Sequence, residues 1–496
     1  MNTPGRGWFA LLVLAAAAAL RLVDLGRWSL DGDELYSWFD VQTLLAGEPW
    51  PFGARSHPLG YFLMAGVTAL LGHSEWALRL GPALCSLGAV AALLWMRRDV
   101  VPRGTALAAG TLAALSPWLV FHGQNARFYG PLLLFAAQAT LWALPGPGRR
   151  PRASAAAWVA SVLCHPTAAL LGPALVVPLL RPPVPWRRLA ALAGAVVGVL
   201  LLVWALDDGA LEDVVLRVLE KRDPGRYGAA HLVMGLGYNL GPLVGLLIAL
   251  GVAPALRAQS GTGPLLLAAA TLAPLVLLAV ASFGLSMHQR YAMCAVPAAL
   301  LLAGEGWRAA TERTRAGGAA LAVLALAAFT PGLVAYRQDG NRHDFRALAA
   351  FLHERVGPGD ILVADEHSTV ELYIRKVSGF ADVKVFEEDL VDDKKRTDFL
   401  GNKREVWVAV KTSRLQSGAY GADFTRWLDD FFTPIGTVGV PPPPLVRHDN
   451  RYRVFRRTER ILSRRTSGSP PEDPTGSPTD RGATTPGTPT KEPRDR

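Results

Sequence analysis

The sequence is poor in the residues that build disulfide frameworks and metal centres. It has only three cysteines in 496 residues, an odd number, and all three fall in or beside apolar segments. No disulfide framework is therefore indicated. No two histidines stand four residues apart, the spacing that places two ligands on one helix face. The sequence gives little support for a metal centre, and a divalent cation stays an open option.

Acidic residues are also fewer than basic ones, and the formal net charge is +10. Such a charge could indicate nucleic-acid binding. The basic residues, however, form short clusters between apolar segments, which is the pattern of membrane topology signals. We therefore expect no nucleic-acid partner.

What the chain does contain is a series of long apolar runs. A bilayer core needs roughly 20 apolar residues in a helix, and only helices or closed barrels satisfy backbone groups in lipid. The runs are continuous rather than alternating, which favours helices. We predict about eleven transmembrane helices within a membrane domain of residues 1–335, at 8–24, 76–96, 104–121, 129–144, 153–165, 167–180, 189–206, 236–255, 263–283, 290–304 and 318–335.

Two apolar segments allow other interpretations. Residues 8–24 could be a cleaved signal peptide with Arg6 as its basic region, although the later spans favour a membrane anchor. Residues 59–72 are too short to cross comfortably, and we expect a helix at the interface or dipping into it.

Arginine clusters set the expected orientation. With a cytoplasmic N-terminus, alternate short loops carry Arg97, Arg98 and Arg103; Arg149, Arg150 and Arg152; Arg181, Arg187 and Arg188; Arg257; and Arg308, Arg313 and Arg315. The positive-inside rule places such loops in the cytoplasm. Residues 25–75, 122–128, 207–233 and everything after about 336 are then non-cytoplasmic.

The chain changes character after the last span. Residues 341–458 alternate between amphipathic helix patterns and short β-branched runs, which predicts a soluble α/β domain outside the cytoplasm. Residues 463–496 are rich in Ser, Pro, Thr and Arg, so we predict a disordered tail.

The most informative polar segment follows the first span. Asp33 and Glu34 form an adjacent acidic pair at the membrane surface, where ionised groups are costly unless used or paired. Neighbouring acids push their pKa values apart, which suits one of them to accept a proton. A solvated loop with a helix cap explains the same residues equally well.

Arginines and histidines gather at the same predicted face. Arg127 and Arg290 stand at outer span ends, where a guanidinium can bind phosphate bidentately or reach the lipid headgroups. Six histidines also fall at outer boundaries or loops, which suggests a polar cavity opening outward: His57, His73, His122, His165, His231 and His288.

These segments, in this order, resemble the GT-C glycosyltransferases of the protein mannosyltransferase and aminoarabinose transferase branch. The resemblance runs over roughly residues 8–335. Its elements are the acidic pair with a following tyrosine (Asp33, Glu34, Tyr36), a His-Pro-aromatic segment (His57, Pro58, Tyr61), a Gln-x-Ala-Arg-x-Tyr segment (Gln124, Ala126, Arg127, Tyr129) and a late Arg-Tyr (Arg290, Tyr291).

The resemblance implies an inverting membrane glycosyltransferase. Such enzymes move a hexose or pentose from a polyprenyl-phosphate carrier to a lipid, glycan or protein acceptor at the outer face of the bacterial inner membrane. Asp33 is then the base that deprotonates the acceptor, Glu34 orients it or helps bind a cation, and Arg127 and Arg290 hold the lipid-linked phosphate. The implied substrate pocket is Tyr36, His57, Tyr61, Gln124, Tyr129, His165 and Tyr291.

The sequence leaves several points open. Asn125 stands where the family has an acid, so a second acid is unassigned, with candidates Asp207, Asp208, Glu212 and Asp213. A transporter or flippase for a lipid-linked or small polar substrate is the alternative function, and a scaffold for the soluble domain is a third. Transporters tend to contain internal repeats, and the sequence shows no convincing one, which argues against a transporter. A scaffold does not explain the acids and arginines at the outer span ends. Neither sugar nor acceptor is named by the sequence.

Overall fold

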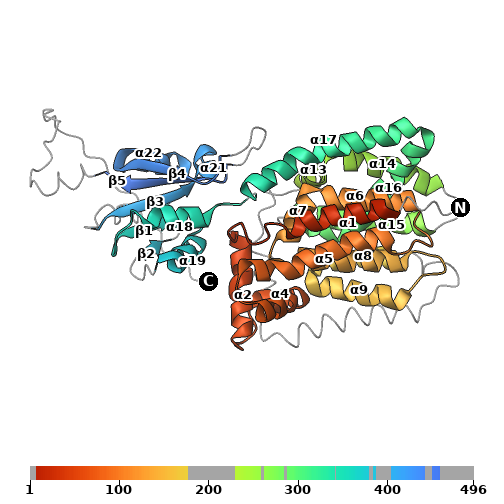
Figure 1. The fold of residues 1–496 in the computed structure, drawn as a ribbon, viewed down its shortest axis with the longest axis horizontal. Helices are drawn as coiled ribbons and strands as arrows, with labels where there is room; N and C mark the ends of the chain where they lie inside the picture. The colour runs from red at the N-terminus through yellow and green to blue at the C-terminus, as the bar shows by residue number, and fades with distance from the viewer. Residues whose placement is uncertain are drawn as a thin grey trace, which may run out of the picture.

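The computed structural model describes residues 7–176, 229–257, 262–283, 287–340, 342–378, 384–386, 404–441 and 449–458. The chain forms a helical bundle followed by a smaller domain built on a β-sheet, and helix α17 leads from one to the other (Figure 1). The predicted span 189–206, most of loop 207–233 and the predicted tail 463–496 lie outside the described residues.

The bundle is built from two series of helices. The first series is α1 (Gly7–Leu22), α2 (Gly32–Leu45), α3 (Phe52–Ser56), α4 (Pro58–Leu71), α5 (Glu75–Trp95), α6 (Arg103–Leu115), α7 (Pro117–Gln124), α8 (Tyr129–Ala143), α9 (Pro151–Cys164), the 3₁₀ helix η2 (Pro166–Leu171) and α10 (Gly172–Val176). The second is α13 (Ala229–Leu240), α14 (Pro242–Arg257), α15 (Thr262–Ala281), η4 (Gln289–Ala295), α16 (Val296–Arg313) and α17 (Arg315–Asp339).

Helix α16 lies at the centre of the bundle, packed against α6 and α14. Two glycines allow this close approach. A Cβ atom on Gly304 would overlap the Thr105 carbonyl of α6, and one on Gly306 would overlap the Leu247 carbonyl of α14. Small residues at helix contacts are the usual means of close packing between apolar helices in lipid.

The predicted number of eleven spans is not confirmed. Within the described residues, three helices are long and apolar enough to cross a membrane, over 75–95, 263–281 and 316–338, and the bent pair α6 and α7 would make a fourth. Several other predicted spans are apolar helices of 10–17 residues. At about 1.5 Å per residue, 16 residues cover roughly 24 Å, less than a core of about 30 Å.

Two predicted spans are broken where the sequence contains a helix-breaking residue. Predicted span 104–121 bends by 64° between α6 and α7. The break is at Ser116, which caps α7 just before Pro117. Predicted span 236–255 is divided between α13 and α14 at Gly241, whose φ of +91° is a conformation that favours glycine.

The second part of the chain is a five-stranded mixed sheet in the order β2-β1-β3-β5-β4. Strands β2, β1 and β3 are parallel, and β5 runs antiparallel to both β3 and β4. Helices α18 and α19 cover one face and α22 covers the other, each over its own apolar core. The elements are α18 (Phe345–His353), β1 (Ile361–Ala364), α19 (His367–Ser378), β2 (Lys384–Phe386), β3 (Val406–Lys411), α21 (Thr412–Gln416), α22 (Gly421–Phe431), β4 (Phe432–Val438) and β5 (Tyr452–Arg457).

Polar contacts join this domain to the bundle beside α2. The Tyr373 hydroxyl accepts a hydrogen bond from the Leu30 N–H at 2.7 Å and donates to the Glu75 carboxylate at 2.6 Å. The guanidinium of Arg346 pairs with the same Glu75. Glu366 places its carboxylate against Gly32, the first residue of α2. The sheet domain is therefore held at the helix that carries the acidic pair.

The Tyr373 contact can be tested by removing one oxygen. Tyr373→Phe leaves both the Leu30 N–H and the Glu75 carboxylate short of a partner in a buried position, which costs about 1–3 kcal/mol. We expect a lower melting temperature in detergent. Tyr36→Phe is the matched control, because that side chain is 67% exposed and its change should be close to neutral. Equal melting temperatures for the two variants would contradict the contact.

Candidate active site

The acidic pair lies in the first turn of helix α2, because the local sequence is a helix start. Asp31 is the N-cap, and its carboxylate accepts a hydrogen bond from the Glu34 N–H at 2.7 Å. The Glu34 carboxylate accepts in return from the Asp31 N–H at 3.1 Å, which completes a capping box. A helix cap is therefore present in this segment, and it is formed by Asp31. The same cap fixes the positions of Asp33 and Glu34.

Glu34 is fully buried and surrounded by donors. Arg79 donates to its two oxygens at 2.8 and 2.6 Å, the Ala126 N–H donates at 2.7 Å, and Arg342 donates at 3.3 Å. Burial alone would raise the pKa of this carboxyl, but Arg342 and Arg79 outweigh it and lower the pKa to about 2. Glu34 is therefore a fixed anion in the interior.

Arg79 binds both the Glu34 carboxylate and the backbone of the α1–α2 connection. Its side chain is fully buried, and its remaining N–H groups donate to the carbonyls of Leu25, Trp28 and Ser29 at 2.7–3.0 Å. One guanidinium thus joins α5, the α1–α2 connection and the first turn of α2. Because Glu34 is buried and paired with Arg79, we interpret it as a residue that positions the helix. Its predicted contact with the acceptor or a cation stays a prediction.

Asp33 has a different environment from its neighbour, since its side chain is 39% exposed. Arg290 donates to its carboxylate at 2.5 Å, whereas Arg127 donates to its backbone carbonyl at 2.9 Å. Burial raises the pKa of Asp33, but Arg290 and Arg127 together outweigh that effect and lower it. The structure therefore brings together the three residues predicted to converge, from α2, the α7–α8 turn and η4.

Both arginines retain unused donors. The Nε atoms of Arg127 and Arg290 are buried without a hydrogen-bond acceptor. Arg127 also donates weakly to Ser37 at 3.2 Å and to the predicted pocket residue Tyr61 at 3.4 Å. Buried N–H groups without acceptors are costly, so they mark a place where an oxyanion would be bound favourably.

A wall of rings lies beside Arg127 and Arg290. His57 stacks on Phe128 with ring centroids 3.9 Å apart, and His165 lies 5.1 Å from His57. Tyr291 and Tyr129 are 5.7 and 6.3 Å from His165. Four predicted pocket residues thus form one cluster, together with Phe128.

Two other predicted pocket residues have different surroundings. Gln124 is buried and donates to the carbonyls of Arg21 and Val23 at 3.1 and 3.2 Å, and it accepts from Tyr336. These contacts tie α7 to α1 and α17. Tyr36, on α2, is 67% exposed.

Sequence reasoning missed two residues of this network, Arg79 and Arg342, and it noted Asn125 only as a departure from the family pattern. A charged residue inside a predicted span is a functional-site signal, so Arg79 could have been found within 76–96. Asn125 donates to Asp31 at 3.1 Å, where an acid was expected from the family. Arg342 follows the last span in a polar stretch, and no pattern distinguishes it from its neighbours.

Metal binding and the second acid are not assigned by the structure. Across the residues that the structure describes, no three His, Cys, Asp or Glu side chains gather as a metal site. The candidates for a second acid, Asp207, Asp208, Glu212 and Asp213, lie outside the described residues.

The buried pair makes a measurable prediction. Arg79→Met leaves Glu34 without its bidentate partner, and breaking a buried ion pair from one side costs about 3–5 kcal/mol. Arg98→Met removes an exposed arginine at the other end of the same segment and should leave the melting temperature nearly unchanged. Glu34→Gln together with Arg79→Met should lose less stability than the two single changes added. Strict additivity would argue against the pair.

Comparison with known proteins supports one family. Residues 54–206 match the family model described as dolichyl-phosphate-mannose-protein mannosyltransferase. Among curated proteins, no significant match is found.

Solved structures share the fold at low sequence identity. ArnT from Cupriavidus metallidurans bound to undecaprenyl phosphate matches with a TM-score of 0.55 and 15% identity, covering 92% of this chain and 99% of that chain. The Archaeoglobus fulgidus oligosaccharyltransferase, in complex with zinc and sulfate, matches with a TM-score of 0.50 and 13% identity, covering 92% and 76%. The family model and the shared fold together confirm the predicted resemblance to the GT-C membrane glycosyltransferases, in the branch of the protein mannosyltransferases and the aminoarabinose transferases.

Proposed function

We propose that this protein transfers a sugar, with inversion, from a polyprenyl-phosphate carrier to an acceptor hydroxyl at the non-cytoplasmic face of the bacterial inner membrane. The observation that carries the proposal is the meeting of Asp33 with Arg127 and Arg290. An inverting transfer needs a carboxylate base on one side of the sugar and fixed positive charge for the departing phosphate on the other. The orientation rests on the arginine-rich loops.

Each of the three residues has a separate task in this proposal. Asp33 accepts the proton of the acceptor hydroxyl as that oxygen attacks the anomeric carbon. Arg127 and Arg290 bind the phosphate oxygens through their unused Nε–H donors, and so stabilise the charge that develops on the leaving phosphate. The cognate carrier is proposed by analogy with undecaprenyl phosphate, which the ArnT structure contains.

Arg290 connects donor binding to the strength of the base. The Arg290 guanidinium pairs with Asp33 and keeps the pKa of that carboxyl low, which makes Asp33 a weak base. A bound phosphate competes for the same guanidinium. As this ion pair weakens, the pKa of Asp33 rises toward its ordinary value, and proton acceptance becomes easier. In this proposal the base is therefore strongest when a donor is bound.

The cluster of rings has the character of a saccharide subsite. His57, His165 and Tyr291 combine apolar faces with polar atoms, and Phe128 lies against Arg127 with its ring centroid 4.8 Å from the guanidinium carbon. We place the transferred sugar against this wall, next to the phosphate that the two arginines hold. The polar edges of the rings can then accept or donate hydrogen bonds to sugar hydroxyls.

The base assignment is tested by a conservative substitution. Asp33→Asn removes the proton acceptor and keeps the shape, so kcat should fall about 10²–10⁴-fold. The assay is transfer from polyprenyl-phosphate-linked sugars in membranes that contain the protein. Asp24→Asn, the same chemical change at a residue paired with Arg27 and Arg337, should keep full transfer. Full transfer by Asp33→Asn would refute the assignment.

The pH dependence tests the part given to Arg290. An ordinary aspartate has a pKa of about 4. Since the pKa of Asp33 is lowered, the acid limb of the kcat/KM profile should lie below that value. Arg290→Gln leaves the raising effect of burial and removes a lowering charge, so the acid limb should move toward neutral pH. The profile of kcat, which reports the donor complex, should already show its limb at higher pH in the wild type. Superimposable limbs for wild type and Arg290→Gln would contradict the coupling.

A further inference from the structure

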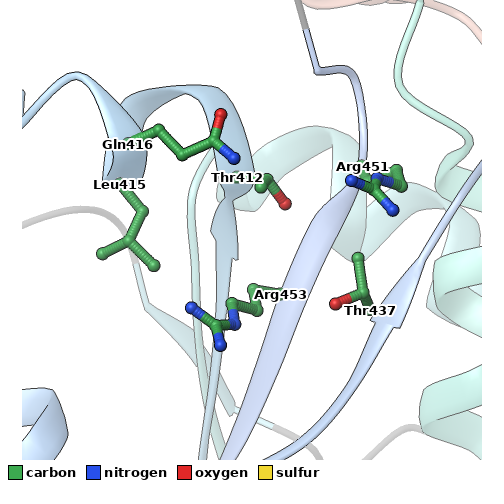
Figure 2. Close-up of a pocket in the computed structure, with 6 residues that line it drawn as sticks. All are labelled: Thr412, Leu415, Gln416, Thr437, Arg451 and Arg453. Atoms are coloured by element: carbon green, nitrogen blue, oxygen red, sulfur yellow. The ribbon is translucent and has the colours of Figure 1, made fainter. Parts of the chain in front are cut away.

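A cavity in the sheet domain lies apart from the acidic pair and its arginines. It has a volume of about 420 Å³, within the range of small-molecule sites. It opens between α21, the start of β5 and the end of β4, and is lined by Thr412, Leu415, Gln416, Thr437, Arg451 and Arg453 (Figure 2). Five of these six side chains carry polar groups and none is acidic.

Sheet register explains why these side chains meet. Thr437 of β4 pairs directly with Arg453 of β5, so both side chains leave the sheet on the same face. Thr412 begins α21 where β3 ends, and its N–H donates to the Arg451 carbonyl at 2.9 Å. Figure 2 shows the Thr412 and Thr437 hydroxyls facing the space between them.

The two arginines differ in how their charge is used. Arg451 donates to both oxygens of Asp449 at 2.8 and 2.7 Å, so much of its charge is neutralised. Arg453 is exposed, and among the described residues no carboxylate pairs with it. Arg453 also lies over the Phe455 ring, with its guanidinium carbon 5.7 Å from the centroid. The cavity is therefore lined by an exposed guanidinium that no described carboxylate neutralises, which favours an anionic occupant.

A third observation comes from Thr412. The residue is 7% exposed, and its hydroxyl oxygen is buried without a hydrogen-bond partner. A buried hydroxyl without a partner costs free energy, so it needs a reason beyond folding. The Thr412 side chain lines the same cavity as the Gln416 amide, the Thr437 hydroxyl and the Arg453 guanidinium. Hydroxyls and amides are the groups that recognise a polyol, and the guanidinium recognises an oxyanion.

We infer that this cavity binds an anionic saccharide, a sugar that carries a phosphate or a carboxylate. Arg453 holds the oxyanion, and the Thr412, Thr437 and Gln416 side chains bind hydroxyls of the ring. Leu415 gives the ring an apolar surface on one side.

The position of the cavity connects it to the transfer site. Thr412 follows Lys411, whose ammonium pairs with Glu366. Glu366 in turn places its carboxylate against Gly32, the residue before Asp33. The cavity therefore lies next to Lys411, the last residue of β3. Lys411 contacts Glu366, and Glu366 lies against the start of α2. An acceptor with an anionic sugar could be anchored there while another part reaches Asp33; this identification of the occupant as acceptor rests on the proposed function.

The binding test uses the full chain in detergent micelles and ligand-observed saturation-transfer NMR. The probes are glucose 6-phosphate and glucuronate. Glucose, which lacks the anionic group, and inorganic phosphate, which lacks the sugar, are the controls. We expect both anionic sugars to bind. Arg453→Gln should lower the affinity for the tighter-binding sugar about tenfold or more. Arg426→Gln removes an arginine from the exposed surface of α22, 71% exposed, and should leave binding unchanged.

Thr412→Val is a second variant, for which we expect stability and binding to change in opposite directions. It removes a hydroxyl that has no partner, so the melting temperature should stay or rise, whereas binding should weaken about 2- to 10-fold.

Several outcomes would overturn the inference. They are no binding of either anionic sugar, equal binding by Arg453→Gln and Arg426→Gln, glucose binding as well as its 6-phosphate, or inorganic phosphate binding as tightly as the sugar phosphate. These results would leave the test of Asp33→Asn unaffected. Conversely, full transfer by Asp33→Asn would remove the proposed chemistry without changing the probe binding.

Discussion

The buried contact between Glu34 and Arg79 is the constraint on which the site depends. It takes two charges out of water, which is costly, and recovers that cost only through nearly complete hydrogen bonding. The bidentate geometry, the Ala126 N–H and the three carbonyls around Arg79 supply it. Because Glu34 follows Asp33 in the chain, fixing the first also fixes the second. Glu34 thus holds the helix, and in the proposed function Asp33 faces the substrate.

This division explains why two neighbouring carboxyls differ so much in environment. On a helix, consecutive side chains point about 100° apart, so one can face the interior while the next faces an opening. Glu34 faces α5 and the Ala126 turn, and Asp33 faces Arg290 of η4. The ring cluster that contains His57 and His165 lies beside Arg127, because its member Phe128 packs against that guanidinium. A polar site is obtained at the edge of the bundle without exposing the ion pair beneath it.

The sequence predicted which polar residues meet better than it predicted where the helices begin and end. Asp33, Arg127 and Arg290 were expected to converge because of the family resemblance, since the residues alone are explained equally well by a helix cap and by contacts with lipid headgroups. The breaks at Ser116 and Gly241 were not predicted, since a hydropathy pattern averages over single residues that end a helix. Helix α2 was expected as a loop, although Asp31 and Glu34 form a capping box that the sequence already contains. Arg342 could not be found from sequence, because its pairing with Glu34 spans 308 residues and depends on tertiary packing.

Arg342 has a consequence for how the two parts of the molecule communicate. It stands between α17 and α18, where the bundle gives way to the sheet domain, and its guanidinium contacts both Glu34 and Asp31. A rotation of the sheet domain about this junction would withdraw a cation from two carboxylates at the start of α2. The orientation of the domain and the charge balance beside Asp33 are therefore thermodynamically linked. Under the proposed function, a ligand that favours one orientation of the domain would change the affinity for the proposed sugar donor, and the donor would change the affinity for that ligand by the same factor.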